Sequence, residues 1–157
     1  MRGLHDIAQL GLGPNAGKVN SLEVIPDAAL VHEKGVIVWA GPQDALPESL
    51  DAKVQNWESA EGRAVLPGFV ESHTHIMYAG SRAHEFGRRC AGATYEEIAA
   101  SGGGIRFTAR QVAESSEAEL VDAALPRAQE LLVYGVTTLE VKSGYGLSTE
   151  NELKMGG

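Results

Sequence analysis

The sequence is poor in cysteine, in basic residues and in long apolar runs. Its one cysteine, Cys90, has no partner for an internal disulfide, which favours a reducing, cytoplasmic setting. The 13 Lys and Arg residues are outnumbered by 21 Asp and Glu, a net charge of −8. This balance argues against a nucleic-acid partner, since phosphate-binding surfaces need clustered cations. No run approaches the roughly 18 apolar residues of a membrane span, so we also expect no membrane partner.

The chain is also short for one common architecture. Its 157 residues could fold as one ordinary domain, whereas a complete (β/α)₈ barrel needs about 250 residues. Glycine is abundant, with 19 residues, and a typical frequency is about 7%. This content predicts many tight turns in a soluble globular protein.

The first part of the chain predicts a small β-rich domain over residues 1–63. Residues 1–18 are weakly patterned, and Gly11 to Lys18 only superficially resembles a phosphate-binding loop, because Leu12 and Val19 occupy positions that need Gly and Ser or Thr. Residues 27–32 and 36–41 are rich in β-branched and apolar residues and flank a Glu-Lys-Gly turn. This pattern predicts a β-hairpin.

Residues 64–157 show a different order of elements. An apolar run at 65–73 predicts a buried strand, and Thr94 with Glu97 and Ser116 with Glu119 have the spacing of helix capping boxes. A second strand is expected at 136–142, and Thr149 with Glu152 opens another helix. The resulting βαβα order is typical of an α/β fold with a parallel sheet.

The strongest candidate site is His73-Thr74-His75, at the end of the first of these strands. Residues i and i+2 of a strand point to the same face, so both imidazoles can reach one metal ion. Imidazole suits Zn²⁺ and Fe²⁺. The alternative is a pair of surface histidines in a loop. The apolar strand before the pair favours the metal site, which would still need further ligands because catalytic zinc usually has three.

Two further residue types could bind a substrate. Arg82 and the Arg88-Arg89 pair follow the histidines, and an arginine beside a metal site can bind a substrate carboxylate through two hydrogen bonds. Tyr145 lies between two glycines in the loop after the second strand, where its hydroxyl could face a ligand. The alternative for each is an ordinary solvated side chain, and residue spacing alone does not decide between them.

Three segments resemble one known family. The run Leu-Pro-Gly-Phe-Val-Glu-Ser-His-Thr-His at 66–75 resembles the first barrel strand of the metal-dependent amidohydrolase superfamily. Gly-Gly-Gly-Ile at 102–105 and Lys-Ser-Gly-Tyr-Gly-Leu at 142–147 together resemble the imidazolonepropionase family, whose members act in histidine degradation. The resemblance is close over about residues 64–155 and loose over residues 20–63.

This resemblance implies a fold, an activity and a set of site residues. The fold would be the first βα units of a (β/α)₈ barrel over residues 64–157, preceded by part of a small β-sandwich domain over residues 1–63. The activity would be hydrolysis of 4-imidazolone-5-propanoate to N-formimidoyl-L-glutamate. His73 and His75 would bind one Zn or Fe ion, Arg82 the substrate propionate and Tyr145 the imidazolone ring. The full-length enzyme could form a homodimer.

The resemblance also implies that much of the site lies elsewhere. The family draws further metal ligands and an acid/base group from later barrel strands, so we expect an N-terminal fragment that is unstable or inactive alone. Two alternatives stay open. One is another cyclic amidohydrolase or a deaminase with the same first strand, and the other is a non-catalytic truncated product.

Overall fold

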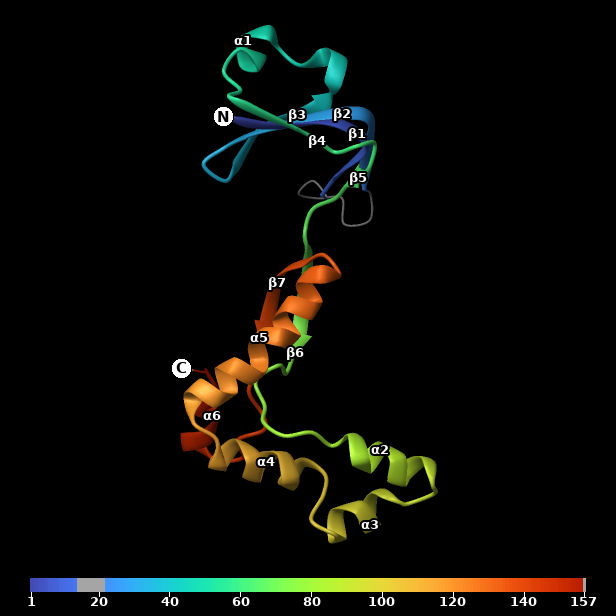
Figure 1. Ribbon diagram of the computed structural model, residues 1–157, viewed down its shortest axis with the longest axis vertical. Helices are drawn as coiled ribbons and strands as arrows, with labels where there is room; N and C mark the ends of the chain where they lie inside the picture. Colours follow the sequence, from blue (N-terminus) through green and yellow to red (C-terminus); the bar gives the residue numbers. More distant parts are fainter. Residues whose placement is uncertain (14–21, 157) are drawn as a thin grey trace. The chain divides into compact units, whose positions relative to one another are not determined.

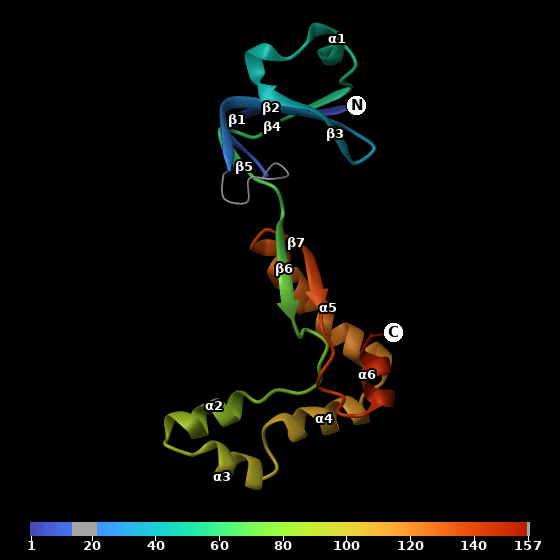
Figure 2. The same cartoon turned by 180° about the vertical axis from the view of Figure 1, so that it is seen from behind.

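A computed structural model describes residues 1–13 and 22–156, and the chain divides into two compact units, Met1–Pro67 and Gly68–Gly157. Figures 1 and 2 show the elements of each unit from opposite sides. The phosphate-loop-like stretch lies largely outside the described residues. In the part of the chain that is described, no helix is long and apolar enough to cross a membrane.

The first unit is built on one mixed sheet. Its strands are β1 (Arg2–Leu12), β2 (Glu23–Glu33), β3 (Val36–Pro42), β4 (Asn56–Ser59) and β5 (Ala64–Val65). The order is β3-β2-β1-β4, with β5 also paired to β1. A 3₁₀ turn (Gln43–Ala45) and helix α1 (Glu48–Asp51) connect β3 to β4. The described residues form a single sheet here, so the predicted β-sandwich stays a prediction.

The predicted hairpin is confirmed, whereas the central strand was missed. β2 and β3 pair antiparallel around Lys34 and Gly35, whose φ angles of 49° and 81° suit the tight turn. β1 lies in the weakly patterned region. Its register shifts between Leu4 and Ile7, where Asp6 has a φ of 55°. This irregularity breaks the alternation of apolar and polar residues that would have indicated a strand.

The second unit follows the predicted βαβα order. Strand β6 (Phe69–Thr74) pairs in parallel with β7 (Val136–Val141). Helices α2 (Ala83–Cys90), α3 (Tyr95–Ala100), α4 (Ile105–Glu114) and α5 (Glu117–Val133) form the crossover between them, and α6 (Thr149–Gly156) follows β7. Both views show β6 and β7 side by side with α5 along them (Figures 1 and 2). This arrangement confirms the expected α/β class and parallel pairing, while the (β/α)₈ barrel stays a prediction.

The extent and burial of the first strand in this unit were predicted wrongly. The apolar run 65–73 is divided at the Pro67–Gly68 junction, because Ala64 and Val65 pair with β1 of the first unit. In β6 the side chains of Phe69 and Val70 are 54% and 69% exposed. The sheet of this unit has two strands among the described residues, and the apolar side chains at the start of β6 are not packed into a core.

Local capping and a small core hold the helices of the second unit. Thr94 and Ser116 each form the predicted capping box, with Glu97 and Glu119 respectively. The core contains Val112 of α4, Leu120 of α5 and Met155 of α6, all buried. Residues of the two loops that follow β6 and β7 pack against this core: Met77, Tyr78, Ala79 and Tyr145. The core therefore sets the position of both loops.

Candidate metal and substrate site

The predicted histidine pair lies at the carboxyl end of β6, as the strand register requires. Thr74, between the two histidines, is tied to β7: its carbonyl accepts from the Lys142 amide at 2.8 Å, and its hydroxyl donates to the Glu140 carbonyl at 2.6 Å. The imidazoles of His73 and His75 lie together with ring centroids 5.3 Å apart. Alternation along the strand thus brings the two rings close to each other.

The loop after β7 meets this pair. Gly144 has a φ of +135°, a conformation that favours glycine, and an added Cβ there would lie 3.4 Å from Cε1 of His75. The next residue, Tyr145, places its ring 5.5 Å from the His75 ring, centroid to centroid. Because the carboxyl ends of parallel strands share one edge of a sheet, loops distant in sequence converge here.

His75 carries an unsatisfied polar atom. Its Nδ1 is buried and has no hydrogen-bond partner among the residues that the structure describes, although buried nitrogens of this kind are usually paired. A metal ion or a ligand atom would satisfy such a nitrogen. Across the described residues, no group of three or more His, Cys, Asp or Glu side chains is arranged to hold a metal. The residues present therefore fit part of a metal site, with two imidazoles as ligands.

Glu152 of α6 holds the Tyr145 loop in place. Its Oε1 accepts from the amides of Gly146 and Leu147 at 2.8 and 2.9 Å. Burial acts to raise the pKa of Glu152, but the Ser143 hydroxyl and the loop amides outweigh this effect, so the pKa lies below its usual 4.5.

The predicted start of helix α6 at Thr149 is confirmed. Ser148, however, provides the hydroxyl that accepts from the Asn151 amide at 3.3 Å.

A second carboxylate lies beside the histidine pair. The Lys142 ammonium is hydrogen-bonded to Glu140 and holds the pKa of that carboxyl below its usual range, and His73 adds a weaker effect. Both residues are at the end of β7, on the edge where His73 lies. The edge therefore carries opposite charges within a short distance of the imidazoles.

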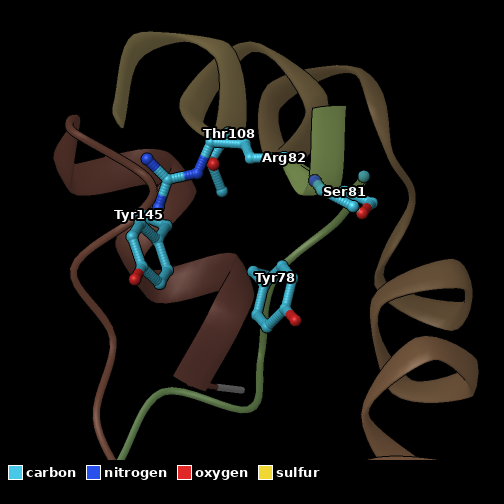
Figure 3. Close-up of a pocket in the computed structure, with 7 residues that line it drawn as sticks. Tyr78, Ser81, Arg82, Thr108 and Tyr145 are labelled. Atoms are coloured by element: carbon cyan, nitrogen blue, oxygen red, sulfur yellow. The ribbon is translucent and has the colours of Figure 1, made fainter. Parts of the chain in front are cut away.

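Arg82 and Tyr145 line one cavity of about 330 Å³ (Figure 3). Arg82 directly precedes α2, and Figure 3 shows its guanidinium reaching across the cavity toward Tyr145. Tyr78 lies at another side, with its ring 5.9 Å from that of Tyr145 in an edge-on arrangement. The remaining lining residues are Gly80, Ser81, Ala83 and Thr108. The four residues singled out from the sequence are thus connected: His73 contacts His75, His75 contacts Tyr145, and Tyr145 shares the cavity with Arg82.

Arg82 has one carboxylate near it. Its Nη1 lies 3.9 Å from Oε2 of Glu85, a side chain that is buried in α2. The other oxygen of Glu85 accepts from the Gly104 amide at 2.8 Å, at the start of α4. Glu85 therefore links the glycine-rich turn to the arginine, while the Arg82 side chain stays 38% exposed and open to a ligand.

The other cationic candidates lie away from the cavity lining. Arg88 donates to the Ser101 hydroxyl at 2.7 Å, Arg89 is exposed, and His84 packs edge-on against Phe107. Sequence reasoning missed Tyr78 and Thr108. Tyr78 lies between the two motifs in an irregular segment, and Thr108 is one buried polar residue in a helix, so neither carried a local signal.

The amino-acid sequence of the chain is similar to those of several curated enzymes. The chain is 46% identical to an imidazolonepropionase of Symbiobacterium thermophilum, over 97% of the chain and 36% of that protein. It is 48% identical to that of Hyphomonas neptunium and 50% identical to that of Paracoccus denitrificans, over 91% and 84% of the chain. The chain is homologous to part of imidazolonepropionase. It spans about a third of the length of these curated relatives.

The chain was also compared with protein-family models and with solved structures. No protein-family model matches the chain. Among solved structures, Aspergillus niger ochratoxinase is similar with a TM-score of 0.51 and 18% identity, over 92% of this chain and 26% of that one. At this identity the likeness concerns the fold alone. The similarity to ochratoxinase supports a mixed α/β fold for this imidazolonepropionase homologue. The chain corresponds to only part of that larger fold.

Proposed function

We propose that this chain supplies the first part of the active site of a metal-dependent hydrolase that converts 4-imidazolone-5-propanoate to N-formimidoyl-L-glutamate. The observation that carries the proposal is the position of Tyr145, which lines one cavity together with Arg82 and also lies against the ring of His75. One aromatic ring thus connects the histidine pair to a cavity lined by a guanidinium. The homology to imidazolonepropionases supports the choice of substrate.

His73 and His75 would hold a single Zn or Fe ion. Such an ion acts as a Lewis acid and lowers the pKa of a bound water toward about 7. The buried, unpaired Nδ1 of His75 supports an occupant at this edge of the sheet. Two imidazoles suit either metal, and the remaining ligands would come from residues beyond those described.

Arg82 and the two tyrosines would bind and orient the substrate. A guanidinium forms paired hydrogen bonds with a carboxylate, so Arg82 would hold the propionate. Tyr145 contacts both the His75 ring and the cavity, which would place the imidazolone ring next to the metal. The cavity volume of about 330 Å³ is at the lower end of the roughly 300–1,000 Å³ of small-molecule sites.

The finer architecture belongs to the same proposal. β6 and β7 would be the first two strands of a (β/α)₈ barrel, with residues 64–157 as its first two βα units. Residues 1–63 would be part of a small β-sandwich domain. The whole protein would be a cytoplasmic enzyme, able to form a homodimer, that acts on a small molecule and not on nucleic acid or a membrane.

A chimera tests the activity. This chain would replace the matching 36% of the Symbiobacterium thermophilum imidazolonepropionase, and turnover of 4-imidazolone-5-propanoate would be measured with Zn²⁺ or Fe²⁺ present. We expect the chimera to be active, the His73→Ala and His75→Ala variants to be inactive, and the His32→Ala variant in the first unit to match the chimera. The 157-residue chain alone, tested in parallel, should be inactive.

The outcomes separate the alternatives. A folded, metal-loaded chimera that turns over dihydroorotate or guanine but not imidazolonepropionate would point to another cyclic amidohydrolase or a deaminase. A folded chimera with no turnover of any of the three would point to a non-catalytic chain. Circular dichroism and metal analysis establish folding and loading in each case.

A further inference from the structure

Arg127 of α5 contacts the segment that joins the histidine pair to Arg82. Its Nη1 donates to the Ile76 carbonyl at 2.6 Å and to the Tyr78 carbonyl at 2.9 Å. Its guanidinium carbon lies 3.6 Å from the centroid of the Tyr78 ring. One half-buried side chain thus binds two backbone oxygens and one aromatic face of the same three residues.

This segment needs an external anchor. Residues 75–82 form neither helix nor strand, so their backbone groups lack the regular partners of secondary structure. At its far end, Gly80 has a φ of +75°, and an added Cβ would lie 2.9 Å from Cγ of Gln111 in α4. The segment is therefore held against α4 at Gly80 and against α5 by Arg127.

Tyr78 transmits this anchoring to the cavity. Its ring contacts the guanidinium of Arg127, lines the cavity and lies edge-on to Tyr145, which in turn contacts His75. Arg127 itself does not line the cavity. Any influence of Arg127 on a ligand must therefore pass through the segment it holds.

We propose that Arg127 is a positioning residue that fixes Tyr78, and through it the spacing between His75, Tyr145 and Arg82. The inference rests on the proposed function only in assigning that spacing to substrate binding. Lysine would not replace arginine here. The planar guanidinium donates to neighbouring oxygens while stacking on a ring, whereas an ammonium is a compact charge on a flexible stem.

The experiment uses the chimera with ¹³C-labelled histidine and tyrosine, and NMR signals of the His75, Tyr78 and Tyr145 rings. Arg127→Lys is compared with Arg110→Lys, a matched control in which a helical arginine donates to the Gly102 carbonyl at 2.7 Å. Arg127→Lys should shift the signals of all three rings, including the two that Arg127 does not touch. Arg110→Lys should leave them in place. Shifts confined to Tyr78 would overturn the proposal.

Two further measurements test the role of Arg127 without relying on the Arg127→Lys variant. In the unsubstituted chimera, the Nη protons of Arg127 should exchange slowly with solvent and show the upfield shift of protons over an aromatic ring. Rapid exchange at ordinary shifts would overturn the proposal without any substitution. In Arg127→Ala, added guanidinium ion should restore the ring signals of Tyr145 and His75, which a general loss of helix stability would not allow.

Binding of 3-(imidazol-4-yl)propanoate, a ring with the same carboxylate arm, to the chimera connects the positioning to function. Arg127→Lys should raise its dissociation constant about tenfold, as expected for lost geometry in a charge-assisted site. Arg110→Lys should change it less than twofold. If the unsubstituted chimera does not bind this probe, the substrate assignment fails while the ring signals still decide the role of Arg127.

Discussion

The ring of His75 lies 5.5 Å from the ring of Tyr145, centroid to centroid, although the two residues follow different strands of the parallel pair. The contact joins the histidine pair after β6 to the glycine-rich loop after β7. It depends on the pairing of β6 with β7 and on Gly144, whose φ of +135° is a backbone conformation that favours glycine.

Removing either imidazole should weaken zinc binding. His73→Ala and His75→Ala should each raise the dissociation constant for Zn²⁺ at least about tenfold, since even changes that only reorient a ligand typically cost 10–100-fold. Isothermal titration of the purified chain or of the chimera measures this. His32→Ala, in the first unit, should bind zinc as the unsubstituted protein does. Equal affinity for Zn²⁺ in all three variants would show that His73 and His75 do not bind the metal.

Arg82→Ala should raise KM for 4-imidazolone-5-propanoate at least about tenfold, because a charge-assisted paired contact contributes about 1.5–3 kcal/mol. The measurement is steady-state turnover by the chimera. Arg89→Ala is the matched control, since Arg89 is an exposed arginine in the helix that Arg82 precedes. An unchanged KM in the Arg82 variant would show that this guanidinium does not bind the substrate.

Gly144→Ala should lower the free energy of unfolding of the second unit by about 1–3 kcal/mol, the range for strained backbone conformations. The new methyl group would lie 3.4 Å from Cε1 of His75, an ordinary van der Waals distance, so the cost comes from the backbone conformation. Gly87→Ala in α2 provides the opposite case, because nothing lies within 4 Å of its added Cβ. That variant should be about 0.5–1 kcal/mol more stable. Urea unfolding followed by circular dichroism compares the two, and a similar loss in both would contradict the argument.

Acid should loosen the Tyr145 loop through Glu152. The pKa of this carboxyl is lower in the folded chain than its usual 4.5, so its contribution to stability is complete above that value and is lost as the pH falls through the lower folded pKa. In Glu152→Gln the thermal midpoint should fall less steeply over this range. Glu150→Gln, an exposed position in the same helix, should keep the steep fall. Parallel curves for all three proteins would rule out Glu152 as the group responsible.

The sequence predicted those parts of the structure that depend on neighbouring residues. The hairpin at Lys34 and Gly35, the two capping boxes and the parallel βαβα order all follow from short-range patterns. β1 was missed because its register shift at Asp6 interrupts the alternation on which a strand prediction depends. The burial of β6 was overestimated, since an apolar run indicates burial only where a second layer covers it.

Some parts of the candidate site could likewise be predicted from the sequence, and others could not. The His-x-His spacing and the loop containing Tyr145 are local motifs, and the structure brings both to one edge of the sheet. The contact between Arg127 and Tyr78 was not predictable, because it depends on how α5 crosses the loop after β6. A helical arginine in a sequence looks the same whether it faces solvent or binds a distant carbonyl.

Parallel pairing also determines when this site can form during folding. The histidine pair and Tyr145 meet only after the four-helix crossover has closed the chain between β6 and β7, and non-local closure of this kind is slow. Interactions that form after the folding transition state affect mainly the rate of unfolding. A ligand that bridges the two loops should therefore prolong the lifetime of the folded second unit while leaving its rate of folding almost unchanged.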